Sequence, residues 1–287
     1  MRGAGAGGVV VSDPFTEALE AAGAPIVGFA EPSPELRTIV DGPITYYPEL
    51  IQGSDAWYEV RCGLLTASEM KLILTEPKWD RKEDAAPTIK YNLLKGASND
   101  KERAHVYELA GQRVTKFVEH HYISDDMLRG KDDEIAAREL YRQHYAPVEE
   151  VGFMTNARWG FKLGFSPDGF VSDNGFIEAK SRRQKYQMET FTEYVTEGIQ
   201  PEEYILQTQT GFIVSERKWC DFISFSGGLH MATIRVWPDA KIMNAIIEAA
   251  GEFELRVMKK MERYREMLKS TARLIPTERR IETEMHL

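Results

Sequence analysis

The chain is poor in cysteine, has no long hydrophobic run and carries no excess of positive charge. Its two cysteines, Cys62 and Cys220, cannot make a disulfide framework, so we expect a reducing intracellular compartment. No stretch approaches the roughly 18 uncharged apolar residues of a membrane helix, and the N-terminal residues lack the apolar core of a signal peptide. The net charge of −9 argues against a generally basic nucleic-acid binder but leaves room for a local basic channel.

What is present is the composition of an ordinary folded protein. With 287 residues, 43% of them hydrophobic, the chain is long enough for one large domain or two small ones. Residues 1–45 are rich in Gly, Ala and Pro, and we expect an N-terminal extension that is partly disordered. Residues 46–287 are expected to form a single domain with a long C-terminal helix.

Hydrophobic periodicity and turn signals predict the order of helices and strands. The predicted helices cover residues 55–62, 90–96, 102–118, 132–145, 186–196, 201–215 and 239–268. The predicted strands cover residues 148–154, 159–165, 170–171, 176–177, 219–225 and 231–236. Asn174-Gly175 is a strong hairpin signal, and Thr66 to Glu69 has the form of a helix capping box. This order predicts an α/β fold with a central mixed β-sheet flanked by helices.

The window from Ser166 to Lys180 carries the most chemical information. Asp168 precedes one strand of the hairpin, and Glu178 and Lys180 lie two residues apart in the returning strand, so their side chains share a face. The two carboxylates and the carbonyl of Ala179 make an oxygen-rich site suited to Mg²⁺ or Mn²⁺. A metal ion beside an ammonium group is what phosphodiester hydrolysis requires. Spacing alone leaves a second interpretation, in which an exposed charge pair flanks an ordinary turn.

The segment from Pro167 to Lys180 resembles the PD-(D/E)XK nuclease motif. Three further segments resemble one branch of that superfamily, the phage-lambda-type exonucleases, also called YqaJ-like viral recombinases. They are Gln52-Gly53-Ser54-Asp55-Ala56-Trp57 continuing to Glu69, Gly130-Lys131-Asp132-Asp133-Glu134 continuing to Arg138, and Tyr204 with Gln207-Thr208-Gln209 and Trp219-Cys220-Asp221-Phe222. The four segments follow the order of the family along residues 51–226.

The resemblance implies a restriction-endonuclease-like core and a Mg²⁺-dependent 5′–3′ exodeoxyribonuclease, with Mn²⁺ as a substitute ion. Such an enzyme digests one strand of linear double-stranded DNA from its 5′ end. It leaves a 3′ single-stranded tail for a strand-annealing recombinase. The resemblance also implies a homotrimer around DNA, encoded by a phage or prophage and acting in the bacterial cytoplasm.

By the same resemblance, Glu134 completes the metal site formed by Asp168, Glu178 and Ala179, and Lys180 positions the attacking water. Without the family pattern, Glu134 is one acid of a solvated charged run. Its neighbour Asp133 takes the role if the register differs by one residue.

Gln207 is the amide expected beside the catalytic strands. Gln207 and Gln209 lie about 200° apart on a helix, so only one of them is expected to reach the site. In this superfamily a helix glutamine contacts the catalytic lysine or the substrate. We choose Gln207, which has Tyr204 on its side of the helix.

Arg61 and Ser68 mark a predicted anion site. A helix start offers free N–H groups with partial positive charge, and a guanidinium can hold a phosphate by two hydrogen bonds. In the family this region binds the 5′-phosphate of the digested strand. A helix cap beside a surface arginine is the plainer interpretation, and both can hold together.

Arg182 and Arg183 directly follow the catalytic strand and are predicted to contact DNA backbone phosphates. The family often has Cys-Pro at the position of Ser181-Arg182, so the chain departs from its pattern there. A solvated charge cluster explains these residues equally well.

Two other functions remain open from the sequence. A restriction or repair endonuclease would use the same catalytic core, and a non-catalytic DNA-end binding protein would have kept only the fold. A covalently closed circular duplex separates the first from an exonuclease. Truncation of Asp168, Glu178 and Lys180 without any effect would identify the second.

Overall fold

A computed structural model describes residues 36–83, 85–119 and 125–279 of the chain. The compact unit that contains them begins at Leu36. Residues 39–47 form a hairpin that pairs onto a larger sheet, so the predicted domain boundary at residue 45 falls inside an element of this unit. The rest of the predicted extension, residues 1–35, lies outside the described residues.

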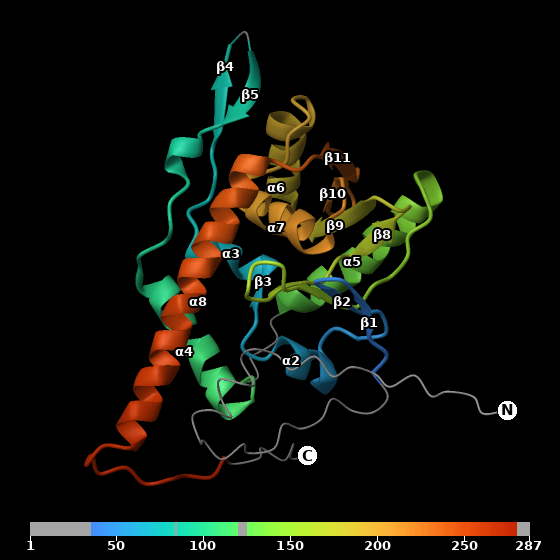
Figure 1. The fold of residues 1–287 in the computed structure, drawn as a ribbon. Helices are drawn as coiled ribbons and strands as arrows, with labels where there is room; N and C mark the ends of the chain where they lie inside the picture. The colour runs from blue at the N-terminus through green and yellow to red at the C-terminus, as the bar shows by residue number, and fades with distance from the viewer. Residues whose placement is uncertain (1–35, 84, 120–124, 280–287) are drawn as a thin grey trace, which may run out of the picture. The chain divides into compact units, whose positions relative to one another are not determined.

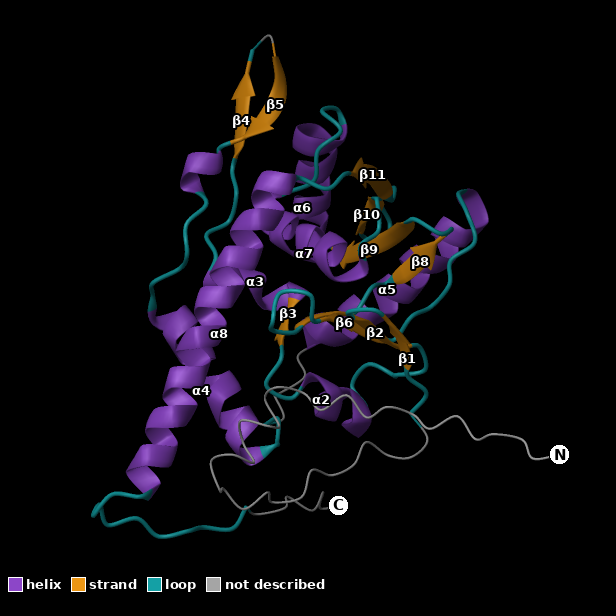
Figure 2. Ribbon diagram, viewed as in Figure 1, coloured by secondary structure: helices purple, strands orange, loops and turns teal. Residues whose placement is uncertain are grey.

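Helices and strands alternate through most of the described chain (Figures 1 and 2). The strands are β1 (Ile39–Asp41), β2 (Ile44–Tyr47), β3 (Leu65–Thr66), β4 (Trp79–Lys82), β5 (Ala85–Ile89), β6 (Phe153–Asn156), β7 (Leu163–Phe165), β8 (Gly169–Val171), β9 (Gly175–Ser181), β10 (Trp219–Phe225) and β11 (Ala232–Val236). The α-helices are α2 (Asp55–Arg61), α3 (Met70–Ile73), α4 (Asp100–Thr115), α5 (Asp125–His144), α6 (Gln184–Glu189), α7 (Ile205–Ser215) and α8 (Ala240–Leu268).

The strands form two sheets and a separate hairpin rather than one central sheet. One sheet has the order β1-β2-β6-β7-β3, the other has the order β11-β10-β9-β8, and β4 pairs only with β5. In the second sheet, β9 runs parallel to β10 and antiparallel to β8. The predicted mixed α/β class flanked by helices is therefore confirmed, with the sheet divided in two.

Helix α7 packs between the two sheets and contacts strands of both. Every residue of α7 except Gln207 is buried. A helix that is covered on all sides by apolar neighbours is expected to be buried in this way. Helix α5 covers the other face of β9 and β10, where Ala137 and Tyr141 pack against Ile177, Ala179 and Ile223. The catalytic strand predicted from the sequence is thus enclosed by α5 on one face and α7 on the other.

The hairpin β8–β9 forms as expected, but Gly175 is needed there for a reason other than the turn. The residue with left-handed backbone is Ser172, with φ of 50°, and not Gly175. A Cβ atom on Gly175 would lie 2.1 Å from the indole ring of Trp219, so close packing requires the glycine. The Asn-Gly signal therefore predicts the right hairpin for a partly wrong reason.

Several elements differ from the prediction. The predicted helix over residues 90–96 is one 3₁₀ turn, Tyr91–Leu93, and the hairpin β4–β5 was not predicted in this polar stretch. Helix α5 starts at Asp125 rather than near residue 132, so Glu134 lies in the middle of a helix instead of at its start.

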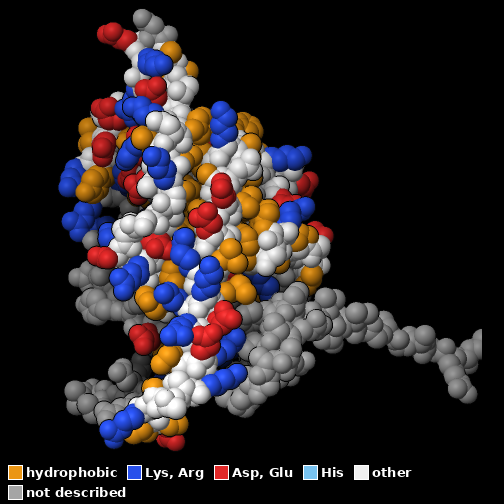
Figure 3. Space-filling model, turned by 60° about the vertical axis from the view of Figure 1, so that its left-hand side comes forward, with side chains coloured by type: hydrophobic (Ala, Val, Ile, Leu, Met, Phe, Trp, Pro, Cys, Tyr) orange, Lys and Arg blue, Asp and Glu red, His pale blue; other side chains and the backbone are white. Residues whose placement is uncertain are grey.

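The long helix α8 begins where the sequence predicts, with the Asp239 side chain accepting hydrogen bonds from the backbone N–H groups of Lys241 and Ile242. Its inner face packs against α4, α3 and α7. On the face of the protein that carries this helix, basic and acidic side chains are interspersed (Figure 3). Among the described helices, none is both long and apolar enough to cross a membrane.

Candidate active site

Strand β9 places the predicted catalytic side chains on one face. Its first five residues are buried between β8 and β10, and Glu178, Lys180 and Arg182 point toward α7 because side chains alternate along a strand. Gly169 pairs with Ile177 in the neighbouring strand. This register brings Asp168 back to β9, where its Oδ2 accepts a hydrogen bond of 2.5 Å from the N–H of Ala179.

The Glu178 carboxylate is buried at the centre of the site, with 1% of its surface exposed. Its Oε1 lies 2.5 Å from Lys180 Nζ and accepts a hydrogen bond of 2.6 Å from Gln207 Nε2. Its Oε2 is buried and has no hydrogen-bond partner among the described residues. A buried carboxylate oxygen without a partner is costly, and a cation would satisfy it.

The Asp168 carboxyl group meets a second acid across the hairpin edge. The Glu134 side chain lies close enough to Asp168 for the two acids to influence each other's pKa, which places α5 beside the start of β8. The residue at the alternative register, Asp133, instead accepts a hydrogen bond from Ser181 Oγ. The structure therefore places Glu134, and not Asp133, beside Asp168.

Burial dominates the acid–base properties of this group. It raises the pKa of Asp168 to about 8, aided by the neighbouring charge of Glu134 and opposed by Lys180. It also raises the pKa of Glu178 to about 7, again opposed by Lys180. Burial alone would lower the pKa of Lys180, but attraction to Glu178 and Asp168 raises it above its ordinary value. Lys180 is therefore a firmly protonated ammonium among carboxyl groups that gain from a further positive charge.

The residues present fit a divalent metal ion. Among the described residues, no three His, Cys, Asp or Glu side chains form a ready-made metal cluster. The site instead offers two carboxylates on adjacent strands, the Ala179 carbonyl and the nearby Glu134, a set of hard oxygen donors of the kind that Mg²⁺ binds. The unpartnered Oε2 of Glu178 and the raised pKa of Asp168 both indicate room for added positive charge.

A cleft of about 800 Å³ opens beside this group. Glu134, Ala179 and Lys180 lie in its wall, with basic and aromatic side chains around them. Its other basic and aromatic lining residues are Arg129, Lys131, Arg182, Arg183, Trp57, Tyr58, Tyr186 and Tyr204. A cleft with basic and aromatic walls suits a nucleic-acid strand, because cations pair with phosphates and rings stack on bases.

Arg138 is a site residue whose role the sequence did not reveal. Its Nη1 donates a hydrogen bond of 3.0 Å to the backbone carbonyl of Asp168 and lies 3.8 Å from Glu134 Oε1. The arginine thus ties α5 to the residue that carries the first carboxylate. Its position four residues after Glu134, on the same helix face, was the available signal.

Arg61 and Ser68 lie outside the lining of the cleft and around one shared hydroxyl. Arg61 Nη2 donates to Thr66 Oγ1 at 3.2 Å, and Ser68 Oγ lies 3.3 Å from the same oxygen. The Arg61 guanidinium also stacks 4.2 Å from the ring centroid of Trp57, which does line the cleft. Glu69 accepts hydrogen bonds from the N–H and hydroxyl of Thr66, as the predicted capping box requires.

The helix start predicted to bind an anion is shorter than expected. Residues 67–69 form a 3₁₀ turn, and α3 adds only four residues. Burial lowers the pKa of Arg61, although Glu69 opposes this effect. The positive charge available here comes from the guanidinium rather than from a long helix.

The two arginines after β9 have different surroundings. Arg183 is exposed at the cleft, whereas Arg182 is 6% exposed and its Nη1 donates to Glu203 Oε1 at 2.7 Å and to the Tyr204 hydroxyl at 2.6 Å. The exposed phosphate contact predicted for both arginines therefore describes the setting of Arg183 and not that of Arg182.

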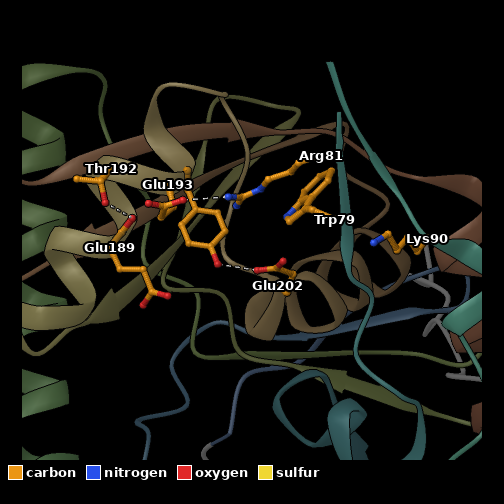
Figure 4. Close-up of a pocket in the computed structure, with 8 residues that line it drawn as sticks. Trp79, Arg81, Lys90, Glu189, Thr192, Glu193 and Glu202 are labelled. Carbon is orange, nitrogen blue, oxygen red and sulfur yellow. Dashed lines mark hydrogen bonds and ion pairs between the residues drawn. The ribbon is translucent and has the colours of Figure 1, made fainter. Parts of the chain in front are cut away.

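A second hollow lies beside the hairpin β4–β5, and two of its acidic side chains, Glu193 and Glu202, already have partners (Figure 4). Arg81 Nη1 lies 3.3 Å from Glu193 Oε2, and the Tyr194 hydroxyl donates to Glu202 Oε2 at 2.7 Å. These internal pairs distinguish the hollow from the site beside the cleft, where Glu178 Oε2 has no hydrogen-bond partner in the part of the chain that the structure describes.

Comparison with known proteins gives the same family as the sequence motifs. A search of curated proteins finds no match to the chain. Among solved structures, the chain is similar to the alkaline exonuclease LHK-Exo of Laribacter hongkongensis, with 25% sequence identity, a TM-score of 0.62, and coverage of 76% of this chain and 100% of that one. LHK-Exo in complex with dAMP matches with 25% identity, a TM-score of 0.57, and coverage of 75% and 100%. The model of the YqaJ-like viral recombinase domain matches residues 56–218, more than half of the chain. The chain belongs to the YqaJ-like viral recombinase domain family.

Proposed function

We propose that the protein is a Mg²⁺-dependent 5′–3′ exodeoxyribonuclease that acts on the ends of linear double-stranded DNA and leaves 3′ single-stranded tails. One observation carries this proposal. Asp168 and Glu178 meet on adjacent strands beside Glu134 and Lys180, at a basic cleft, with a buried Glu178 oxygen that has no partner among the described residues.

The residues have distinct proposed roles. Asp168, Glu178 and the Ala179 carbonyl, with Glu134, would hold Mg²⁺ or Mn²⁺, which supplies charge neutralisation at the phosphate when bound. Lys180 holds the attacking water through its ammonium group, and its side chain is 22% exposed and lines the cleft. Gln207 fixes the orientation of the Glu178 carboxylate by its hydrogen bond.

The surrounding cations supply DNA binding in this proposal. Arg61 and Ser68 bind the 5′-phosphate of the strand to be digested, and Arg183 contacts a backbone phosphate at the cleft. The relative LHK-Exo supports this chemistry, because it is an alkaline exonuclease with a structure in complex with dAMP, a nucleoside monophosphate. A nucleoside 5′-monophosphate is the product expected from stepwise hydrolysis of a DNA strand.

The wider setting follows from family membership. We propose that the protein is encoded by a phage or prophage, works in the cytoplasm of a bacterial host, and assembles into a homotrimer around DNA. A single-strand annealing recombinase is its proposed partner, which would receive the 3′ tail.

A three-way digestion tests the assignment. The substrates are a 5′-phosphorylated linear duplex and its 5′-hydroxyl counterpart, and the enzymes are the wild type and Lys180→Ala, all with Mg²⁺. We expect rapid digestion only of the phosphorylated duplex by the wild type, and none after chelation of the metal. Equal digestion of both duplexes by the wild type, and of the phosphorylated duplex by Lys180→Ala, would remove both the phosphate anchor and the role of Lys180.

A circular substrate separates the competing functions. An exonuclease leaves a covalently closed circular duplex intact, whereas a restriction or repair endonuclease nicks it. A non-catalytic DNA-end binding protein would digest neither form, and its binding would survive truncation of Asp168, Glu178 and Lys180.

A further inference from the structure

The catalytic face of β9 is matched residue by residue by the 3₁₀ turn Glu202–Tyr204 and by the start of α7, which follows it. Glu178 receives the hydrogen bond of Gln207, and Lys180 Nζ lies 5.7 Å from the ring centroid of Tyr204. Arg182, the next residue on this face, binds both Tyr204 and Glu203. These contacts form a ladder that starts at the metal-binding carboxylate. One side of the ladder is Glu178, Lys180 and Arg182, and the other side is Gln207, Tyr204 and Glu203.

Arg182 is the fixed end of this ladder. Its guanidinium lies 5.2 Å from the ring centroid of Tyr204 and 5.2 Å from that of Tyr186, so aromatic rings flank it. Its own N–H donates to the carbonyl of Phe225 at 2.7 Å, which continues the pairing of β9 with β10. The Tyr204 ring also packs against Phe222 of β10, with ring centroids 5.2 Å apart. Tyr204 is therefore held between the sheet and the arginine.

This arrangement is poor for stability. The Nε of Arg182 is buried and has no hydrogen-bond partner among the described residues. A buried guanidinium that is incompletely satisfied costs stability, and apolar replacements of buried ion pairs are often neutral or stabilising. Folding alone thus gives little reason for an arginine here.

We propose that Arg182 is a positioning residue, which holds Tyr204 against Lys180 and so keeps the Lys180 ammonium on Glu178 and facing the cleft. This inference rests on the proposed nuclease function. It replaces the backbone-phosphate contact predicted for Arg182, because the guanidinium is buried and its Nη1 is already bound to Glu203 and Tyr204. Arg183, exposed and adjacent, keeps the phosphate role.

The test compares Arg182→Met with Arg182→Lys in the full chain. We expect kcat to fall about 10- to 100-fold in Arg182→Met, because small displacements of catalytic groups cost this much, with KM and the melting temperature near wild type. Arg182→Lys, which retains a cation between the rings, should recover part of kcat. Glu203→Gln, at a half-exposed position, weakens the same anchor without emptying a buried site and should lower kcat in the same direction.

Two control variants separate positioning from charge. Arg183→Met removes the same charge one residue away and should raise KM while kcat stays within a few-fold of wild type. Arg263→Met removes a charge on α8, where the side chain is 70% exposed, and should change neither parameter. A rise in KM for Arg182→Met, matching that of Arg183→Met, would return Arg182 to a phosphate contact and overturn the proposal.

A second measurement does not depend on nuclease activity. The rate at which an amine-acylating reagent modifies Lys180, followed by mass spectrometry of the folded protein without DNA, should rise several-fold in Arg182→Met and little in Arg182→Lys. If wild-type protein shows no nuclease activity, the proposed function fails while this rate still tests the positioning. An unchanged rate in Arg182→Met, with or without a loss of kcat, would overturn the positioning role.

Discussion

Two charged regions of the protein differ in how far their charged groups are satisfied by neighbouring side chains. At the hairpin β8–β9, three acidic side chains meet one lysine, and one Glu178 oxygen has no hydrogen-bond partner within the described parts of the chain. Around Thr66, the Arg61 guanidinium, the hydroxyls and Glu69 satisfy one another, and the Trp57 ring covers the arginine. We propose that the first region binds a cation, whereas the charged groups of the second already contact one another. We therefore expect the first to control catalysis and the second to adjust the choice of DNA end.

The largest expected effect comes from removing one metal-binding charge. Glu178→Gln should lower the rate of duplex digestion by about 10³-fold or more, because a metal ion at the phosphate contributes several kcal/mol to the transition state. The matched control is Asp173→Asn, which neutralises an exposed carboxylate in the turn of the same hairpin and should keep full activity. Similar losses in both variants would mean that hairpin charge in general, and not the carboxylate of Glu178, supports the reaction.

The phosphate region should give an intermediate effect that depends on the DNA end. Arg61→Lys should slow digestion of the 5′-phosphorylated duplex by about 10- to 100-fold, since a charge-assisted hydrogen bond contributes about 1.5–3 kcal/mol. Digestion of the 5′-hydroxyl duplex should change little. Ser68→Ala, at an exposed position, should reduce the same preference more weakly at an unchanged melting temperature. Equal loss on both ends would assign Arg61 to folding alone.

The two glutamines of α7 should separate catalysis from stability. Gln207→Ala should lower kcat about 5- to 10-fold, because the Glu178 carboxylate loses one neutral hydrogen bond. Gln209 joins the carbonyl of Trp237 to the N–H of Asp239, so Gln209→Ala should lower the free energy of unfolding by about 1–3 kcal/mol with kcat retained. Denaturant unfolding and single-turnover digestion measure the two quantities, and exchanged outcomes would contradict this division.

The last expected effect acts on stability rather than on the rate of digestion, as a pH dependence in metal-free protein. The pKa of Asp168 is raised to about 8 from an ordinary 3.8, so the folded state binds the extra proton and loses stability as pH rises from about 4 through 8. The melting temperature in chelator should fall over this range, by about 2–4 °C for each kcal/mol lost. Mg²⁺ should raise the melting temperature more at pH 8 than at pH 6, because the ion competes with the proton for the carboxyl group. Asp168→Asn should flatten both curves, and an unchanged pH dependence in that variant would contradict the assignment.

The sequence predicts the elements that are strongly apolar or strongly patterned. The strand over Trp219–Phe225 has the predicted bounds, because nearly all its residues are buried and the turns around it are clear. The hairpin β4–β5 was missed because three of the four residues of β4 are charged, β5 contains a proline, and none of these residues is buried, so periodicity gives little signal there.

The residues of the candidate site also divide into those that the sequence predicts and those that it does not. Asp168, Glu178 and Lys180 were predictable because they belong to one local hairpin with fixed alternation. The contacts of Arg138 with Asp168, and of Arg182 with Glu203 and Tyr204, join segments about 20 or more residues apart and depend on how helices dock on the sheet. Spacing along the chain does not contain that information.

The short distance along the chain between Asp168 and Glu178 has a consequence for folding. Loops of about ten residues close within roughly 10–100 ns, whereas Glu134 and Gln207 arrive only when their helices have docked. Two negative groups of the nascent hairpin therefore meet and repel each other before the surrounding helices enclose them. Magnesium in the refolding buffer should shield this early encounter and speed the last stage of assembly.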